Sequence, residues 1–269
     1  MKYLSAGALG ALIGAMLIFP LQAADAARQG LLLWARAVAP VLGPFLALML
    51  LLSSRLPGGA GGKILLSWLC GSPGGARLMQ AMHPRGRTAL RYAAMTGTMS
   101  PMFFLATVSG WLESPAAGWK ILLCHLGGAL LAGLCFRCGE RAPAPSPAPM
   151  PLPQALRESA LALLNVALCM ALGCVCARMT ACALPRLPMW AGVGVQCLLE
   201  VTGGVQALSA LRPPLACSLI CAACSLGGLS LLMQNGAVWR ESGLGLPALL
   251  GCRGLHALFA FLLCLLAGG

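Results

Sequence analysis

Long apolar runs with few charged residues recur along the chain, separated by short segments that carry most of the basic residues. A helix needs about 20 mainly apolar residues to cross the hydrocarbon core of a membrane. Only 9% of the residues are charged and 59% are hydrophobic, whereas a soluble domain carries about 25% charged residues. We therefore expect an all-α, polytopic integral membrane protein. The expected spans number about seven: Tyr3–Ala23, Leu31–Ser53, Tyr92–Leu112, Trp119–Phe136, Ala155–Ala177, Leu215–Leu232 and Leu244–Leu266.

The net charge of +12 lies mostly between the apolar runs, where orientation signals belong, which disfavours a nucleic-acid-binding patch. With the N-terminus inside, most Lys and Arg residues fall on the cytoplasmic face, as the positive-inside rule requires. The inner set is Lys2, Arg55, Lys63, Arg85, Arg87, Arg91, Arg137, Arg141, Arg157 and Arg240, and the outer set is Arg28, Lys120, Arg186 and Arg212. We therefore expect a multi-pass protein of the cell membrane with a cytoplasmic N-terminus.

Two further apolar elements are interrupted by glycine and are too short to span. The first is broken by CGSPGGAR at Cys70–Arg77, and the second by EVTGG at Glu200–Gly204. Such pieces predict re-entrant hairpins or unwound helices, two in all. Two of the full-length runs are also interrupted, by TGTMSP at Thr96–Pro101 and by SLGGLS at Ser225–Ser230.

The order of these features repeats in the two halves of the chain. WLES at Trp111–Ser114 matches WRES at Trp239–Ser242 at an offset of 128, and the two Gly-Gly pairs coincide at an offset of 129. Each repeat holds three spans, an odd number, so the two repeats would sit in the membrane in opposite senses. The alternative is chance similarity between apolar sequences.

The domain organisation follows from this repeat. Residues 1–30 would form an N-terminal anchor helix, 31–137 the first membrane repeat and 154–269 the second. Residues 138–153 are rich in proline and alanine, which predicts an extended, semi-rigid linker. The first helix also resembles a signal peptide, because LQA at Leu21–Ala23 loosely fits a cleavage site, but its long apolar run favours a retained anchor.

Paired interrupted helices in inverted repeats predict a ligand site near the middle of the membrane. A break frees backbone N–H and C=O groups, which are costly in lipid unless they are buried in protein or face a wet cavity. Glu200 is the strongest candidate, because an acidic residue inside a membrane segment is expensive. The candidate substrate-binding residues are Glu200, Thr202, Gly203, Gly204, Gln206, Gly74, Gly75, Ser100, Ser230 and Gln234. The alternative is that the small residues only permit tight helix packing.

No catalytic or metal-binding pattern occurs in the sequence. The CxxC pairs Cys135/Cys138 and Cys221/Cys224 have no nearby histidine at zinc spacing. There is no P-loop, no HExxH motif and no nucleophile elbow. We expect no metal, no cofactor and no enzyme activity; the enzyme alternative is intramembrane acid–base catalysis by Glu200 and the histidines. His125 and His256, both in apolar helices, are expected to make structural hydrogen bonds rather than a proton relay.

Five motifs resemble those of the sporulation integral membrane protein YlbJ family, which is related to nucleoside-recognition (Gate) domain proteins and to spore maturation proteins. They are VAPVLGPF (Val38–Phe45), GSPGGARL (Gly71–Leu78), SPMF (Ser100–Phe103), LLEVTGG (Leu198–Gly204) and LGGLSLLMQ (Leu226–Gln234). The chain departs from the family at TGTM, Thr96–Met99, where an Asn-rich stretch is common. The resemblance implies a role in endospore formation, at the cortex stage, in a spore-forming bacterium, and supplies no established substrate.

Two functions are compatible with these features. The first is a permease-like protein that carries a small polar solute or ion through a site at the two broken helices. The second is a membrane scaffold that recruits other sporulation membrane proteins, with the breaks acting only in packing. A polar cavity that joins the breaks would favour the first, and a solid apolar interior would favour the second.

Overall fold

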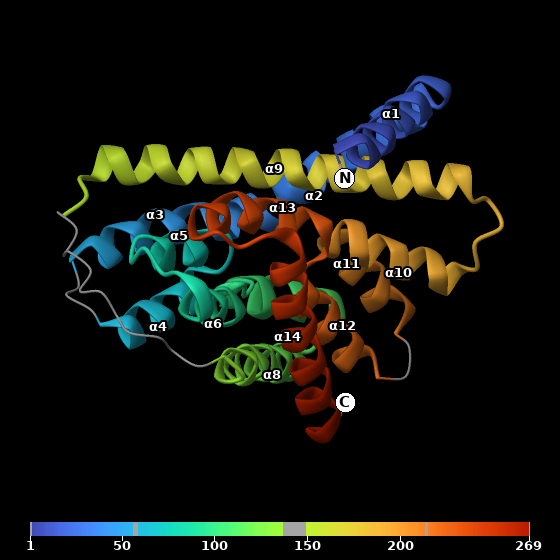
Figure 1. Cartoon of the computed structure of the whole chain (residues 1–269). Coiled ribbons are helices and arrows are strands. Elements are labelled where there is room, and N and C mark those ends of the chain that lie inside the picture. The colour runs from blue at the N-terminus through green and yellow to red at the C-terminus, as the bar shows by residue number, and fades with distance from the viewer. Residues whose placement is uncertain (1, 56–58, 137–148, 213–214, 269) are drawn as a thin grey trace.

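A computed structural model describes residues 2–55, 59–136, 149–212 and 215–268 (Figure 1). Within these ranges the chain is almost entirely helical and forms no strand. The first half consists of α1 (Lys2–Ile18), α2 (Pro20–Leu33), the π-helix η1 (Trp34–Val38), α3 (Ala39–Arg55), α4 (Ala60–Cys70), α5 (Gly74–Gln80), α6 (Gly86–Thr96), the π-helix η2 (Phe103–Val108), α7 (Ser109–Leu112) and α8 (Pro115–Leu134). The second half consists of α9 (Leu152–Ala183), α10 (Met189–Leu199), α11 (Val201–Leu211), α12 (Ala216–Leu226), α13 (Gly228–Trp239), the 3-10 turn η3 (Arg240–Ser242) and α14 (Leu246–Leu266).

Five helical segments of the described chain are long and apolar enough to cross a membrane, which is consistent with a multi-pass membrane protein. They are Pro20–Arg55, Pro115–Leu134, Leu152–Ala183, Ala216–Ser242 and Leu246–Leu266. The structure therefore confirms an all-helical protein with these five candidate spans. It does not confirm the predicted number of about seven.

Three of the expected spans are not single helices. The run Leu215–Leu232 divides at Gly227, inside the expected SLGGLS interruption, where α12 ends and α13 follows. The run Tyr3–Ala23 breaks because α1 ends at Ile18 and α2 starts at Pro20, whose ring restricts the preceding residue and removes an N–H. The helix that starts there continues through η1 and α3 to Arg55, across the expected boundary at residue 30. The run Tyr92–Leu112 is divided at residues 97–100, inside the expected TGTMSP interruption.

The expected linker, residues 138–153, lies mainly outside the described residues. Its last part is described: Pro151 is the N-cap of α9, which starts at Leu152.

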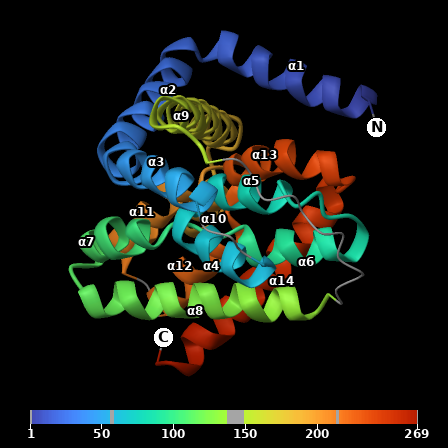
Figure 2. The same cartoon turned by 90° about the vertical axis from the view of Figure 1, so that its left-hand side faces the viewer.

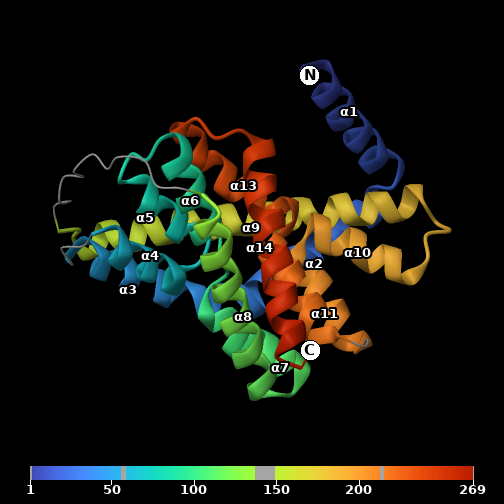
Figure 3. The same ribbon diagram turned by 60° about the horizontal axis from the view of Figure 1, so that its bottom comes forward.

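The long helices do not form one parallel bundle. In Figure 1, α9 runs across the whole molecule with α2 and α3 beside it. These neighbours are antiparallel to α9, since Gly30 faces Ala171 and Gly43 faces Leu163. In Figure 2, α9 is seen end-on while α8 lies across the picture, and Figure 3 shows α8 packed beside α14. The pairs α4–α5 and α10–α11 lie toward opposite ends of α9 (Figure 1).

The contact between α8 and α14 depends on a small residue. A Cβ atom added at Gly128 would lie 2.7 Å from the backbone nitrogen of Ala260 and 2.8 Å from its Cα. Because backbone cannot yield easily, we expect Gly128→Val to destabilise the fold by about 2–3 kcal/mol through overpacking. The measurement is the thermal unfolding midpoint of the purified protein in detergent.

Gly254 on α14 is the matched control for this prediction, because a Cβ there would have no neighbour within 4 Å. Gly254→Val carries the same loss of backbone freedom and the same β-branched side chain. Equal midpoints for the two variants would contradict the close approach of α8 and α14.

Candidate functional site

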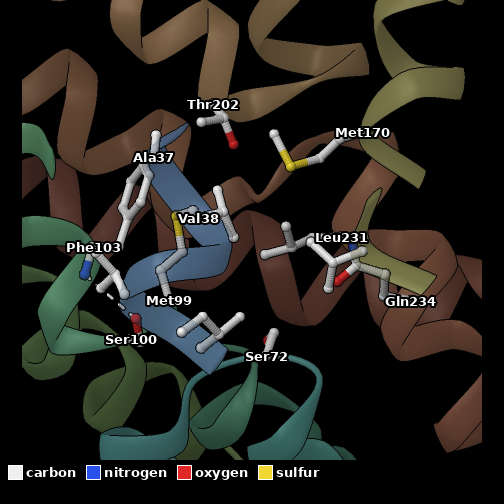
Figure 4. Close-up of a pocket in the computed structure, with 13 residues that line it drawn as sticks. Ala37, Val38, Ser72, Met99, Ser100, Phe103, Met170, Thr202, Leu231 and Gln234 are labelled. Carbon is white, nitrogen blue, oxygen red and sulfur yellow. Dashed lines mark hydrogen bonds between the residues drawn. The ribbon is translucent and has the colours of Figure 1, made fainter. Parts of the chain in front are cut away.

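The four interrupted elements meet at a small cavity of about 50 Å³ (Figure 4). Ser72 comes from the break between α4 and α5, and Ser100 from the break between α6 and η2. Thr202 comes from the start of α11, and Gln234 from α13, which follows the break at Gly227. The remaining walls come from η1, α3 and α9. Figure 4 shows Thr202 and Ser72 on opposite sides of this central cavity.

The breaks are held together by backbone contacts that require glycine. Gly71 has φ +67°, and a Cβ there would lie 2.8 Å from the Cα of Ser100. Next to it, the Ser72 N–H donates to the carbonyl of Thr98 over 2.7 Å. In the second half, Gly228 has φ +61°, and a Cβ there would lie 2.8 Å from the carbonyl oxygen of Cys197. Each short pair of helices therefore docks on the break of the longer element in its own half.

Several buried polar groups around the central cavity have no partner among the described residues. Gln234 is 2% exposed, lines the cavity and leaves its Nε2 unpaired. Asn235 donates from Nδ2 to the Ser72 hydroxyl over 3.2 Å, but its Oδ1 is unpaired. The hydroxyls of Thr98 and Ser230 are unpaired as well. Buried polar groups are usually hydrogen-bonded, and among these residues it is Gln234 that leaves an unpaired group in the wall of the central cavity.

Glu200 caps α11 and does not line the central cavity. Its side chain is fully buried and accepts hydrogen bonds from the N–H groups of Thr202, at 3.0 Å, and Gly203, at 2.6 Å. A carboxylate at this position satisfies free N–H groups and interacts favourably with the helix dipole. It also fixes the start of α11, and with it the side chain of Thr202 in the cavity wall.

Two histidines lie behind the cavity, with ring centroids 4.6 Å apart. His125 accepts at Nε2 from the Met99 N–H over 3.1 Å, so its Nδ1 donates to the Ser225 hydroxyl, 2.7 Å away. His256 in turn donates from Nε2 to the carbonyl of His125 over 2.8 Å. Both histidines therefore make the structural hydrogen bonds expected of them, and they connect the break after α6 to the end of α12.

Arg253 joins the ends of two broken helices and was missed by the sequence analysis. This buried residue of α14 donates to the carbonyl of Gly97 and to that of Leu226, the latter over 3.2 Å from Nε. A third bond runs from Nη2 to the carbonyl of Cys224 over 3.4 Å. The last carbonyls of a helix lack intrahelical partners and carry negative partial charge, so a guanidinium group suits this place. The signal was available, since Arg253 is the one charged residue in the run Leu244–Leu266.

Only some of the predicted site residues meet at the central cavity. Ser100, Thr202 and Gln234 line it. Gly203 and Gln206 line a second cavity on the other side of α11, and Gly74 lines a third. The others, which line none of these three cavities, are Glu200, Gly204, Gly75 and Ser230.

The second and third cavities flank the central one. The second, of about 670 Å³, lies between α2, η1, η2, α7, α9, α10 and α11 and shares Ala37 and Val41 with the central cavity. The third, of about 320 Å³, lies between α3, α4, α5 and α9. Neither α3 nor α9 could be assigned to a cavity wall from its sequence, because both read as ordinary apolar spans.

These features describe an all-helical protein with five segments apolar enough to cross a membrane, consistent with the multi-pass membrane class. Its interrupted helices surround a small, mainly apolar cavity whose wall includes the polar side chains of Ser72, Ser100, Thr202 and Gln234. No protein-family model matches the sequence, and no curated protein or solved structure shows significant similarity to the chain. Among the described residues, no group of His, Cys, Asp and Glu could hold a metal ion.

Proposed function

We propose that the chain is a permease-like membrane protein that carries a small polar solute or ion across the cell membrane. The observation that supports this most directly is the order of the three cavities along α3 and α9. Successive stretches of the helix from Pro20 to Arg55 line the second cavity, then the central one, then the third. The antiparallel α9 lines the same three cavities in the opposite chain direction. Its Cys174 lines the second cavity, Met170 the central one and Glu158 the third.

The length of this series fits a membrane. Arg36 lines the second cavity and Ser54 the third, and they are 18 positions apart in a nearly continuous helix. At 1.5 Å per residue the separation is about 27 Å, close to the thickness of a hydrocarbon core of about 30 Å. The central cavity is the smallest of the three, with a volume of about 50 Å³ and room for only a few water molecules. A larger solute therefore requires the interrupted helices to move.

Two inverted repeats are part of this proposal, and the helix bounds support them. An offset of 129 carries α4 (Ala60–Cys70) onto α10 (Met189–Leu199), and an offset of 130 carries α6 (Gly86–Thr96) onto α12 (Ala216–Leu226). The first residues of α8 and α14 are 131 positions apart, as are His125 and His256. The breaks of the two halves therefore occupy corresponding places.

A role in spore formation is the second part of the proposal and rests on the sequence resemblance alone. The expected partners remain the lipid bilayer, the solute and other sporulation membrane proteins. A scaffold without transport is the weaker alternative, because packing alone does not require unpaired polar groups such as Gln234 at a cavity shared by all four breaks.

The proposal predicts that water-soluble reagents reach the central cavity. In membrane vesicles, Ser72→Cys and Ser100→Cys should react with a small hydrophilic methanethiosulfonate, because both positions line the cavity. Mapping the modified peptides by mass spectrometry separates each introduced cysteine from the native ones.

Ala132→Cys is the matched control, because Ala132 is fully buried in α8 and lines none of the three cavities. We expect it to remain unmodified in folded protein. Cysteines at 72 and 100 that react no faster than the one at 132 would show a dry interior and favour the scaffold.

A further inference from the structure

The third cavity contains a buried lysine whose charge is balanced by no described acid. Lys63 is 7% exposed and lies on the buried face of α4. It forms no ion pair within the described part of the chain. Removing an ammonium group from water is costly unless a counter-charge is close by. An anion bound beside Lys63 would supply the missing counter-charge.

The other charged groups in the wall of this cavity cancel one another. Arg77 and Glu158 form an ion pair, with 3.7 Å between Arg77 Nη1 and Glu158 Oε2. Counting Lys63, the described wall therefore has a net charge of +1. An incoming anion would meet the ammonium of Lys63, the guanidinium of Arg77 and the side-chain amide of Gln154.

Much of the remaining wall is aliphatic. The apolar residues that line this cavity include Leu46, Leu50, Leu78, Ala81 and Ala162. Ser53 and Ser54 add little polarity toward a ligand, because their hydroxyls donate to the carbonyls of Leu50 and Leu51, each over 2.9 Å. An inorganic anion would fill a small part of the 320 Å³ and leave this hydrocarbon surface uncovered. An anionic headgroup attached to an acyl chain suits both the charge and the wall.

We propose that the third cavity binds the phosphate group of an anionic phospholipid, with Lys63 as its principal contact, so that the lipid occupies this end of the series of cavities and a transported solute would have to displace it. Its acyl chain would lie against the aliphatic residues of α3 and α5. The orientation expected from the basic residues places Lys63 and Arg55 on the cytoplasmic face, where anionic lipids give the membrane a negative surface. Basic pockets between membrane helices on that side recognise such headgroups.

The test compares lipids that differ in charge on the purified, full-length protein in detergent. Phosphatidylglycerol should raise the thermal unfolding midpoint and remain bound in native mass spectrometry, about fivefold more strongly than phosphatidylcholine. Lys63→Gln should abolish this preference, and Lys63→Arg should retain it. Arg87→Gln, which removes an exposed charge of α6 outside the cavity, should leave the preference unchanged.

Three results would overturn the proposal. They are equal binding of the two lipids, an unchanged preference in Lys63→Gln, and a full stabilisation by inorganic phosphate alone, which would identify free phosphate as the ligand. If Lys63→Gln does not fold, Arg77→Gln replaces it, because loss of that guanidinium lowers the net charge of the described wall to zero. A preference for phosphatidylglycerol that survives in folded Arg77→Gln would likewise count against the site.

Discussion

Replacement of Arg253 by leucine is expected to prevent accumulation of the folded protein. The guanidinium group donates to the carbonyls of Gly97, Leu226 and Cys224, and leucine would leave all three without this donor in a buried place. An unsatisfied buried acceptor costs about 1–3 kcal/mol, so the summed loss is about 4 kcal/mol or more. That is a large part of the stability of an ordinary domain. The measurement is the yield of monodisperse protein after extraction in detergent, followed by its unfolding midpoint.

Two variants distinguish this role from a simple effect of charge. Arg253→Lys keeps the charge but lacks the planar guanidinium group with its several N–H donors. The ammonium should bond to the carbonyls of one helix end only, giving an unfolding midpoint between those of the wild type and Arg253→Leu. Arg178→Leu removes an exposed arginine of α9 and should leave the midpoint unchanged within about 0.5 kcal/mol. A stable Arg253→Leu protein would show that the ends of α6 and α12 do not depend on this side chain.

The sequence predicted the helical class and the positions of the breaks, because both depend on local signals. Apolar run length identified the segments now seen as α8, α9 and α14, and glycine with proline marked the break near Ser72. The split near Phe19 was missed, because Pro20 within an apolar run was read as part of a continuous span. A proline is tolerated at a helix start as well as inside a membrane helix, so its effect there depends on context.

The site was harder to predict than the breaks, because it depends on which helix faces belong together. Ser100, Thr202 and Gln234 were proposed from their positions beside breaks, and they do share a cavity. Gly74 and Gln206 were proposed on the same grounds but face other cavities. Hydrophobic periodicity and composition describe one helix at a time. They do not specify which face of a helix packs against α3 or α9.

The carboxylate of Glu200 illustrates this limit. Its cost in a membrane segment correctly marked an unusual position, but cost alone does not distinguish a ligand-binding group from a cap. In the structure both carboxylate oxygens are engaged by the N–H groups of Thr202 and Gly203. Its connection to the central cavity is therefore indirect and runs through Thr202, the next residue but one along the chain.

This geometry leads to the second prediction of large effect, that Glu200→Gln will abolish function while leaving membrane insertion intact. A glutamine offers one acceptor oxygen where the carboxylate offers two, so either Thr202 or Gly203 would lose its bond. Loss of one capping bond costs about 1 kcal/mol, which a folded membrane protein tolerates, but it displaces Thr202 at the wall of the central cavity. Glu200→Ala removes both bonds and should cost about 2 kcal/mol.

For the proposed role in spore formation, the functional readout is heat-resistant spore yield in a spore-forming host lacking its own copy of the gene. The amount of protein in the membrane fraction is the insertion readout. Glu113→Gln is the matched control, because Glu113 is an exposed carboxylate that pairs with Arg212 over 3.1 Å, and its loss should alter neither measurement. Normal spore yield from Glu200→Gln at normal membrane levels would contradict a site organised by this carboxylate. If the spore yield falls only in proportion to the amount of protein in the membrane, Glu200 acts only as a stabilising helix cap. A role in the proposed site requires that Glu200→Gln inserts normally and still fails to support spore formation.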